Sequence, residues 1–237
     1  MTTTENNLKL RRPELYKHFM VDSETLGVTP NLNPVLQLAI VEFDPITFKP
    51  TSQTLEIFLP LVEQLNKGAI ANKSTVEWWG KQNPEVLNTI MDGVNNAGSM
   101  NDQLMQVYRW VDKICAPDAK HQNKYKSMFW AKPVLFDYPF VDGLFLQHGV
   151  PSPFHYRNVI DMSSYIISNF LCVHKATKNY DLDFWMAQQL YWNAMDTVKK
   201  ALPEVKEQAH NASADCIFQL NWLREAIHNV DFYLDQI

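Results

Sequence analysis

The chain has 237 residues, of which 46% are hydrophobic and 20% are charged, and its formal net charge is −5 at pH 7. This length and composition suit one globular domain with a single core, and the acidic balance excludes a protein that coats nucleic acid through broad positive charge. No segment approaches the roughly 18 apolar residues that span a bilayer, and the polar start at 1–7 excludes an ordinary signal peptide.

The cysteine pattern gives an expectation about the cellular compartment. Cys115, Cys172 and Cys216 are odd in number, lie far apart and form no C-x-x-C pair. This pattern argues against a disulfide framework and against a structural zinc site. We therefore expect reduced thiols and a cytoplasmic protein with no membrane attachment.

The first part of the chain predicts a tail followed by strands. Residues 1–16 are polar and lack periodicity, which predicts a flexible tail, and residues 17–237 are expected to form a single domain. Apolar, β-like runs predict strands at 17–22, 35–43 and 54–59, joined by turns that contain Pro34 and the pair Asp44-Pro45. Consecutive strands joined by short turns favour an antiparallel start to a sheet.

Helices dominate from Ser74 onward. Ser74 and Glu77 match a capping box, and Pro84 suits the first turn of a helix that runs to Met91. Asp137 is expected to open a later helix that Gly149 ends. In chain order, the remaining predicted elements are a helix at 104–114, strands at 127–131 and 157–161, helices within 162–202 and a final helix at 212–227. This order predicts an α/β fold with a mixed sheet flanked by helices.

Two carboxylates end the first predicted strand. Asp22 and Glu24 are two residues apart, so in a strand they share a face. Like charges this close repel each other unless a cation lies between them or one of them binds a proton. A hard divalent cation is therefore the natural partner, although an isolated D-x-E pair is more often a pair of exposed acids at a strand end.

Two later segments add further acids and a histidine to this pair of carboxylates. They are Phe136-Asp137-Tyr138 and the segment from His210 to Asp215. Together with the first segment, Asp22-x-Glu24-Thr25-x-Gly27, they resemble the motifs of the DEDDh 3′–5′ exonucleases of the DnaQ-like superfamily in order and in residue identity. The segment 74–82, which contains two adjacent tryptophans, is similar to the DexA-type exonucleases of bacteriophages and their bacterial relatives. The resemblance covers roughly residues 17–229.

The resemblance implies a ribonuclease-H-like fold and two divalent cations, Mg²⁺ or Mn²⁺, since carboxylates are their preferred ligands. Asp22 would bridge the two cations, Glu24 and Asp215 would complete the site that activates water, and Asp137 would support the cation at the leaving group. His210 has the family spacing and would be the general base, because imidazole can be neutral near pH 7. A sister subgroup uses tyrosine in this role, but Tyr138 lies beside the second motif rather than in the third.

The resemblance also suggests substrate contacts. Thr25 and Leu26 follow the acidic pair, and Leu26 would wedge against the terminal base. Trp78 and Trp79 point about 100° apart on a helix, so one narrow face cannot bury both. Either one stacks on a base or both pack in the core. Lys132 lies in a stretch where family members often carry an asparagine, and we expect it to touch phosphate instead.

These residues predict a metal-dependent exonuclease that shortens single-stranded DNA or RNA from the 3′ end and releases mononucleotides. One alternative is an oligoribonuclease that acts on short RNAs. Another is a catalytically idle DnaQ-like module that binds nucleic acid or a partner protein. Acids at all four positions favour an enzyme, because a site without catalytic activity has no electrostatic reason to keep carboxylates that repel one another. If a phage encodes the protein, its compartment is the host cytoplasm.

Overall fold

The computed structural model describes residues 15–52, 54–119, 122–177, 183–202 and 209–235. The predicted tail lies outside these residues as far as position 14, whereas Tyr16 already belongs to the first strand. In the part of the chain that the structure describes, no helix is both long and apolar enough to cross a membrane. The thiols of Cys115, Cys172 and Cys216 are free, as the sequence predicts.

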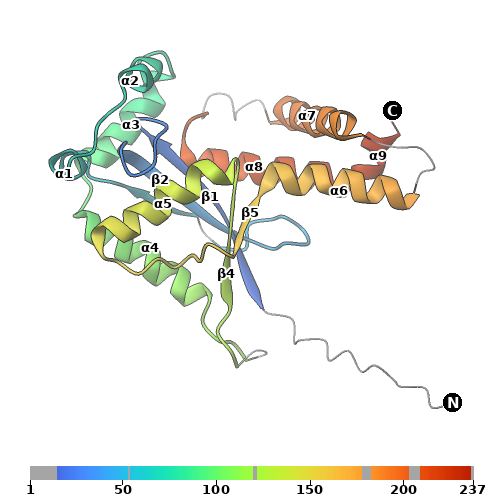
Figure 1. Ribbon diagram of the computed structural model, residues 1–237, viewed down its shortest axis with the longest axis horizontal. Coiled ribbons are helices and arrows are strands. Elements are labelled where there is room, and N and C mark those ends of the chain that lie inside the picture. Colours follow the sequence, from blue (N-terminus) through green and yellow to red (C-terminus); the bar gives the residue numbers. More distant parts are fainter. Residues whose placement is uncertain (1–14, 53, 120–121, 178–182, 203–208, 236–237) are drawn as a thin grey trace.

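A mixed sheet forms the centre of the molecule (Figure 1). Its spatial order is β3-β2-β1-β4-β5, in which β1 pairs antiparallel with β2 and parallel with β4. β2 and β3 are antiparallel, and β4 and β5 are parallel. The strand bounds are β1 (Tyr16–Thr25), β2 (Val35–Phe43), β3 (Leu55–Phe58), β4 (Lys126–Ala131) and β5 (Val159–Asp161). The predicted α/β class with a mixed sheet is confirmed.

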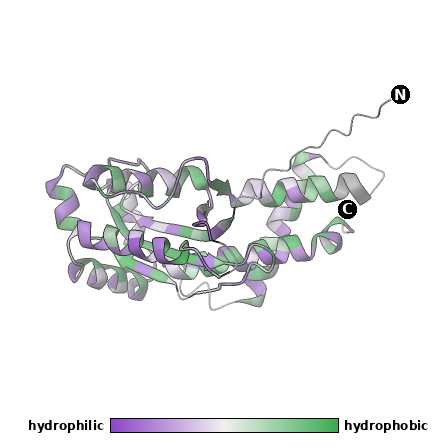
Figure 2. Ribbon diagram, turned by 90° about the horizontal axis from the view of Figure 1, so that it is seen from below, coloured by the Kyte–Doolittle hydropathy of each residue, from purple (hydrophilic) through white to green (hydrophobic). Residues whose placement is uncertain are grey.

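Helices cover both faces of the sheet. On one face lie α4 (Met100–Ile114) and α5 (Val134–His148), and on the other lie α6 (Met162–Thr177), α7 (Phe184–Ala201), α8 (Ala212–His228) and α9 (Val230–Leu234). The next helices in the chain, α1 (Leu61–Asn66), α2 (Lys73–Trp79) and α3 (Pro84–Asn95), lie together at one end of the molecule (Figure 1). Figure 2 shows mostly green, apolar strands between helices that mix green and purple residues. This pattern is expected when each helix buries one face only.

Side chains along β1 alternate between two apolar cores. Phe19 and Val21 pack with residues of α4 and α5, whereas Met20 packs with residues of α6, α7 and α8. The alternation continues into the acidic end of the strand, so Asp22 and Glu24 face the α8 side and Ser23 faces the α5 side. The period of the strand thus decides which layer each polar side chain meets.

Two local predictions were wrong. Asn72, not Ser74, caps α2, because its Oδ1 accepts from the backbone N–H groups of Ser74 and Thr75 at 2.9 and 3.3 Å. Asp137 does not open α5, which begins at Val134 and places Asp137 buried in its first turn. Two short helices, α1 and α9, were not predicted. Each is too short to show a hydrophobic period in the sequence.

Candidate active site

The carboxyl ends of the parallel strands β1, β4 and β5 meet at one edge of the sheet, where α/β proteins commonly bind ligands. β1 brings Asp22 and Glu24 to this edge on the α8 side. Their partners on β2 are Ala39 opposite Asp22 and Gln37 opposite Glu24. Ala39 is small, which leaves room for α8 to approach β1 beside the two acids.

Asp137 reaches the same edge from the other layer. α5 starts shortly after β4, so its first turn lies over the ends of the strands. The Asp137 Oδ1 accepts hydrogen bonds from the backbone N–H and the hydroxyl of Ser23 at 3.0 and 2.6 Å. Asp137 is 2% exposed, so these two bonds hold a nearly buried carboxylate in place.

A hydrogen-bond network fixes the N-terminus of α8 on the sheet. The backbone N–H of Ala212 donates to Gln37 Oε1 at 3.0 Å, while Gln37 Nε2 and Ser213 Oγ both donate to Glu56 Oε1 at 2.8 and 2.6 Å. These contacts join β2, β3 and α8. They determine where Asp215, in the first turn of α8, lies relative to the acids of β1.

His210 precedes α8 and adopts an unusual backbone conformation. Its φ is 68°, in the left-handed region that few non-glycine residues occupy. Its backbone N–H donates to Asp215 Oδ2 at 3.3 Å. Glu24, His210 and Asp215 each offer one ligand atom, and these atoms all lie within 4.8 Å of one another. The structure therefore gathers an acidic and histidine cluster that can hold a divalent cation.

Burial raises the pKa values of all four acids, and neighbouring carboxylates add to the rise for Asp22, Glu24 and Asp137. Burial is the largest cause for each. It raises the pKa of Glu24 to about 8, with further contributions from Asp215 and Asp137. The pKa of Asp22 lies well above its ordinary range through burial and the charges of Asp137, Glu24 and Asp215. For Asp137 the pKa rises to about 7, and for Asp215 to about 6. Without a metal ion, these raised pKa values disfavour ionisation of all four carboxyl groups at once.

These shifts predict that the metal-free protein loses stability as the pH rises. A carboxyl whose folded pKa exceeds its unfolded value binds protons more tightly in the folded state, so stability falls as the pH increases through that interval. The interval here runs from about pH 4, the unfolded value, to about pH 8 at Glu24. We expect a loss on the order of a few kcal/mol, measured by urea unfolding in chelator. Saturating Mn²⁺ should remove most of this pH dependence, and a flat metal-free curve would contradict the prediction.

Gln219 is a site residue that the sequence argument missed. Its Nε2 donates to Asp22 Oδ1 at 2.7 Å, and its own Oε1 is buried with no hydrogen-bond partner among the described residues. A buried acceptor is costly unless a donor reaches it, and water in the site would supply one. The crowded carboxylates and this open acceptor both fit a hydrated cation. The sequence signal was available, because Gln219 lies one helical turn after Asp215.

We predict that Gln219→Leu weakens Mn²⁺ binding about tenfold, because loss of a partner that orients a ligand commonly has this effect. Titration calorimetry gives the affinity without any need for turnover. Asn221→Ala is the matched control, since its amide donates to Ile217 O on the same helix and touches no acid of the site. Equal Mn²⁺ affinities in Gln219→Leu and the wild type would show that Asp22 needs no such support.

The two adjacent tryptophans have different environments. Trp79 is 3% exposed, and its indole N–H donates to the backbone oxygen of Thr25 at 3.0 Å. Trp78 is 40% exposed, and its ring lies edge-on to the His210 ring, with 4.6 Å between the centroids. Both line a pocket of about 420 Å³ that includes Glu24 and Phe136. Of the two, Trp78 offers the more accessible ring.

The other expected substrate contacts also lie near the acids. Thr25 lines the same pocket, and its hydroxyl donates to Gly27 O at 2.6 Å. Leu26 is 9% exposed and packs in a cluster with Trp79, so its role as a wedge stays a prediction. Lys132 Nζ lies 4.7 Å from the ring centroid of Trp222. Burial lowers the Lys132 pKa, and the charge of Asp22 opposes that effect, so this ammonium lies within electrostatic reach of the site.

Comparison with known families gives one extensive match. The profile of a family described as the 3′-5′ exoribonuclease Rv2179c-like domain matches residues 17–227. An exodeoxyribonuclease of Enterobacteria phage T4 is 30% identical over 128 residues, which cover 51% of this chain and 52% of that protein. The match to this curated relative therefore spans about half of the relative's length.

Solved structures with a similar fold include E. coli exonuclease I. Its complex with a dT13 oligonucleotide has a TM-score of 0.59 at 13% identity, with 93% of this chain and 43% of that chain covered. The zinc-bound form of its complex with single-stranded DNA gives 0.58 at 13% identity, with the same coverage of 93% and 43%. At these identities the likeness shows the fold, and the predicted ribonuclease-H-like class is confirmed.

Proposed function

The chain belongs to the family described as the 3′-5′ exoribonuclease Rv2179c-like domain, and from this premise we propose that it is a metal-dependent 3′–5′ exonuclease that releases mononucleotides from single-stranded nucleic acid. One observation carries the proposal. Acids from three distant segments of the chain, on β1, α5 and α8, converge at one edge of the sheet with a histidine beside them. A structural role does not require four carboxylates gathered where burial raises the pKa of each.

The donor set supports two divalent cations, Mg²⁺ or Mn²⁺, held by Asp22, Glu24, Asp137 and Asp215. When bound, such cations stabilise the negative charge that develops on the phosphoryl oxygens and favour ionisation of water. The remaining chemistry belongs to the side chains. His210 takes a proton from the attacking water, and burial lowers its pKa, which keeps the imidazole neutral and able to accept. Lys132 offers a positive charge to the phosphate backbone.

The comparisons support a single-stranded substrate but do not favour DNA over RNA. The family description names an exoribonuclease, the phage T4 relative is an exodeoxyribonuclease, and E. coli exonuclease I was solved with single-stranded DNA. We propose single-stranded DNA or RNA that enters by its 3′ end. Oligoribonuclease activity on short RNAs remains the second candidate. The cytoplasmic location stays a prediction from the cysteine pattern.

The test uses DNA and RNA strands labelled at either end, with Mg²⁺, Mn²⁺ or chelator. We expect a ladder of shortened products from 5′-labelled strands and labelled mononucleotide as the first product from 3′-labelled strands, in both cases only with a cation. Cleavage confined to strands of two to about five nucleotides would favour the oligoribonuclease. Retained binding without cleavage in either cation would favour the idle module, and shortening from the 5′ end would contradict the proposed polarity.

Trp78→Ala should weaken single-strand binding by about 1–3 kcal/mol, the usual value of one base stacked on an aromatic ring. Trp79→Ala should instead lower the free energy of unfolding by about 3–5 kcal/mol, because it leaves a cavity beside Leu26. Fluorescence anisotropy with Ca²⁺ gives the affinity, and urea unfolding gives the stability. If Trp78→Ala lowers the free energy of unfolding but binds single strands normally, Trp78 does not belong to the substrate site.

A further inference from the structure

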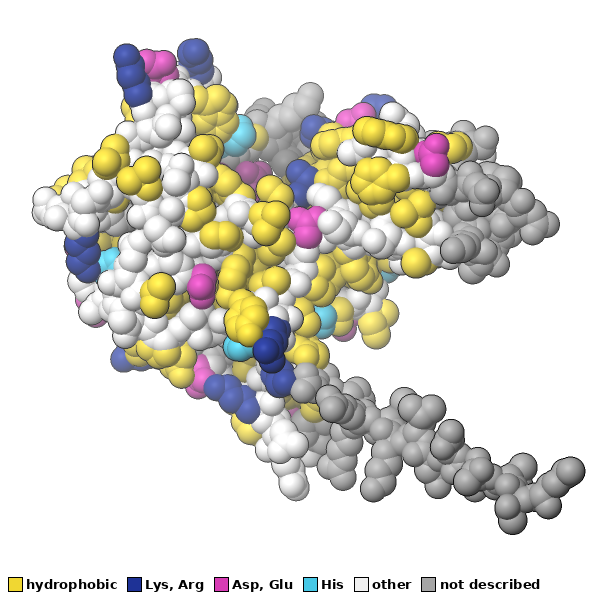
Figure 3. All heavy atoms as spheres, viewed as in Figure 1, with side chains coloured by type: hydrophobic (Ala, Val, Ile, Leu, Met, Phe, Trp, Pro, Cys, Tyr) yellow, Lys and Arg dark blue, Asp and Glu magenta, His cyan; other side chains and the backbone are white. Residues whose placement is uncertain are grey.

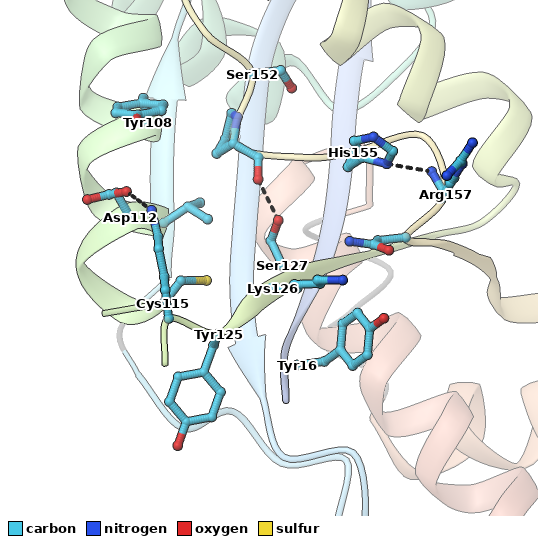
Figure 4. Close-up of a pocket in the computed structure, with 14 residues that line it drawn as sticks. Tyr16, Tyr108, Asp112, Cys115, Tyr125, Lys126, Ser127, Ser152, His155 and Arg157 are labelled. Carbon is cyan, nitrogen blue, oxygen red and sulfur yellow. Dashed lines mark hydrogen bonds and ion pairs between the residues drawn. The ribbon is translucent and has the colours of Figure 1, made fainter. Parts of the chain in front are cut away.

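A second, larger pocket lies at the other end of the sheet. Its volume is about 710 Å³, and it lies between the start of β4, the end of α4 and the loop before β5 (Figure 4). Its lining includes Asp112, Lys124, Lys126, Ser127, His155 and Arg157. None of them belongs to the acidic site.

The charges of this pocket are unevenly divided. Figure 4 shows His155 and Arg157 on one side of β4 and Asp112 on the other, with Lys126 at the start of the strand. Asp112 is the one acid among the described lining residues, and it forms an ion pair with Lys124. The side of β4 that carries His155 and Arg157 is therefore positive in a protein whose net charge is −5.

Three consecutive side chains before β5 form a series of aromatic and cation–π contacts. The rings of His155 and Tyr156 are stacked, with centroids 4.5 Å apart and planes 28° apart. The guanidinium carbon of Arg157 lies 5.3 Å from the Tyr156 centroid. All three side chains are exposed, and Tyr156 is 61% exposed. We call Lys126, His155, Tyr156 and Arg157 the β5-edge patch.

The backbone holds this series in place. Asn158 O accepts from the N–H of Phe129 at 2.8 Å, and Asn158 N–H donates to His155 O at 2.8 Å. The Ser127 hydroxyl also donates to Pro153 O. An exposed aromatic and cationic series on a loop tied to the sheet is suited to binding, because little conformational entropy is lost when a ligand docks.

The edge strand β5 connects the patch to the acidic site. Arg157 precedes β5 and Asp161 ends it, a separation of about 13 Å at the rise of a strand. Asp161 Oδ2 accepts from the N–H of Val134, the first residue of the helix that carries Asp137. Figure 3 shows the face of the molecule seen in Figure 1. Lys or Arg side chains (dark blue) and His side chains (cyan) lie in its lower part, below the indentation between α2 and the α6–α7 pair.

We propose that the β5-edge patch binds the single-stranded substrate upstream of the nucleotide being removed, with a base stacked on the exposed tyrosine and phosphates held by the arginine and lysine. Exposed rings and cations together are the chemistry that recognises single strands without sequence preference. This inference rests on the proposed exonuclease function. It predicts that the enzyme prefers strands long enough to reach from the acidic site to the patch, which distinguishes it from an oligoribonuclease.

The test compares substrates of different length in the double variant Tyr156→Ala/Arg157→Ala. For a strand of about fifteen nucleotides, KM and the anisotropy Kd in Ca²⁺ should rise about tenfold, within the range for loss of one stacked base. For a dinucleotide, whose single upstream nucleotide is too short to reach the patch, kcat and KM should match the wild type. Arg109→Ala is the matched control, because it removes an exposed arginine of α4 that does not line the pocket.

The outcomes separate this inference from the proposed function. A wild-type protein that cleaves no strand would contradict the exonuclease itself. If the wild type cleaves and the double variant keeps normal KM and Kd on the long strand, the proposed role of the patch is contradicted. The proposed exonuclease function is then unaffected. Equal losses on the dinucleotide and the long strand would also contradict the role of the patch, because such losses come from the acidic site. A melting temperature near that of the wild type is expected, since both replaced side chains are exposed.

Discussion

Asp22→Asn should lower the cleavage rate about a thousandfold or more, while the metal-free protein melts at the same or a higher temperature. The rate falls because Asp22 is proposed to hold both cations, which stabilise charge in the transition state. Stability is kept or improved because one charge leaves a site in which Asp137, Glu24 and Asp215 all raise the Asp22 pKa. The asparagine can still accept the hydrogen bond from Gln219, so the change is mainly one of charge.

The measurements are the cleavage rate at saturating Mg²⁺ and thermal melting in chelator. Asp196→Asn is the matched control, since it removes an exposed acid on α7 outside the site. It should leave both quantities unchanged. A large loss of melting temperature in metal-free Asp22→Asn would mean that the carboxylate is structural. Near-normal cleavage would mean that the cations are held without it.

His210→Ala should lower kcat severely, by about a hundredfold to ten-thousandfold, the usual contribution of a general base. KM and the Mn²⁺ affinity should change little, because the histidine acts in the transition state. The wild-type rate should rise with pH as the imidazole becomes neutral. Because burial lowers the His210 pKa, the midpoint of that rise should lie below the ordinary histidine value of about 6.5. In the variant this rise should disappear.

His210→Gln provides the comparison, because its amide fills much of the same space but cannot accept the proton at neutral pH. Both variants should show the same loss. A weakened Mn²⁺ affinity in both would instead assign His210 to the cation, which its place beside Glu24 and Asp215 makes a clear alternative. An unchanged pH profile would remove the histidine from the mechanism. Tyr138 is a poor substitute, since burial raises its pKa to about 12 and its hydroxyl donates to Asp142 at 3.4 Å.

The sequence determined the local elements and the identity of the acids. The apolar, β-like run at 35–43 predicted the strand β2, and the D-x-E spacing at the end of β1 placed two carboxylates on one face. Both signals depend on residues close together in the chain, so a periodic pattern can show them. The motif order then extended the set to Asp137, His210 and Asp215.

Contacts between distant segments were decided only by the tertiary structure. Whether Trp78 or Trp79 faces the core depends on how α2 lies against β1, because the two residues differ by a rotation about one helix axis and by no sequence pattern. The bond from Gln219 to Asp22 joins residues 197 positions apart. The β5-edge patch likewise depends on strand order, which places β5 at the edge of the sheet. Spacing along a chain specifies periods and faces, whereas burial and electrostatic coupling arise from the packing of layers that are distant in sequence.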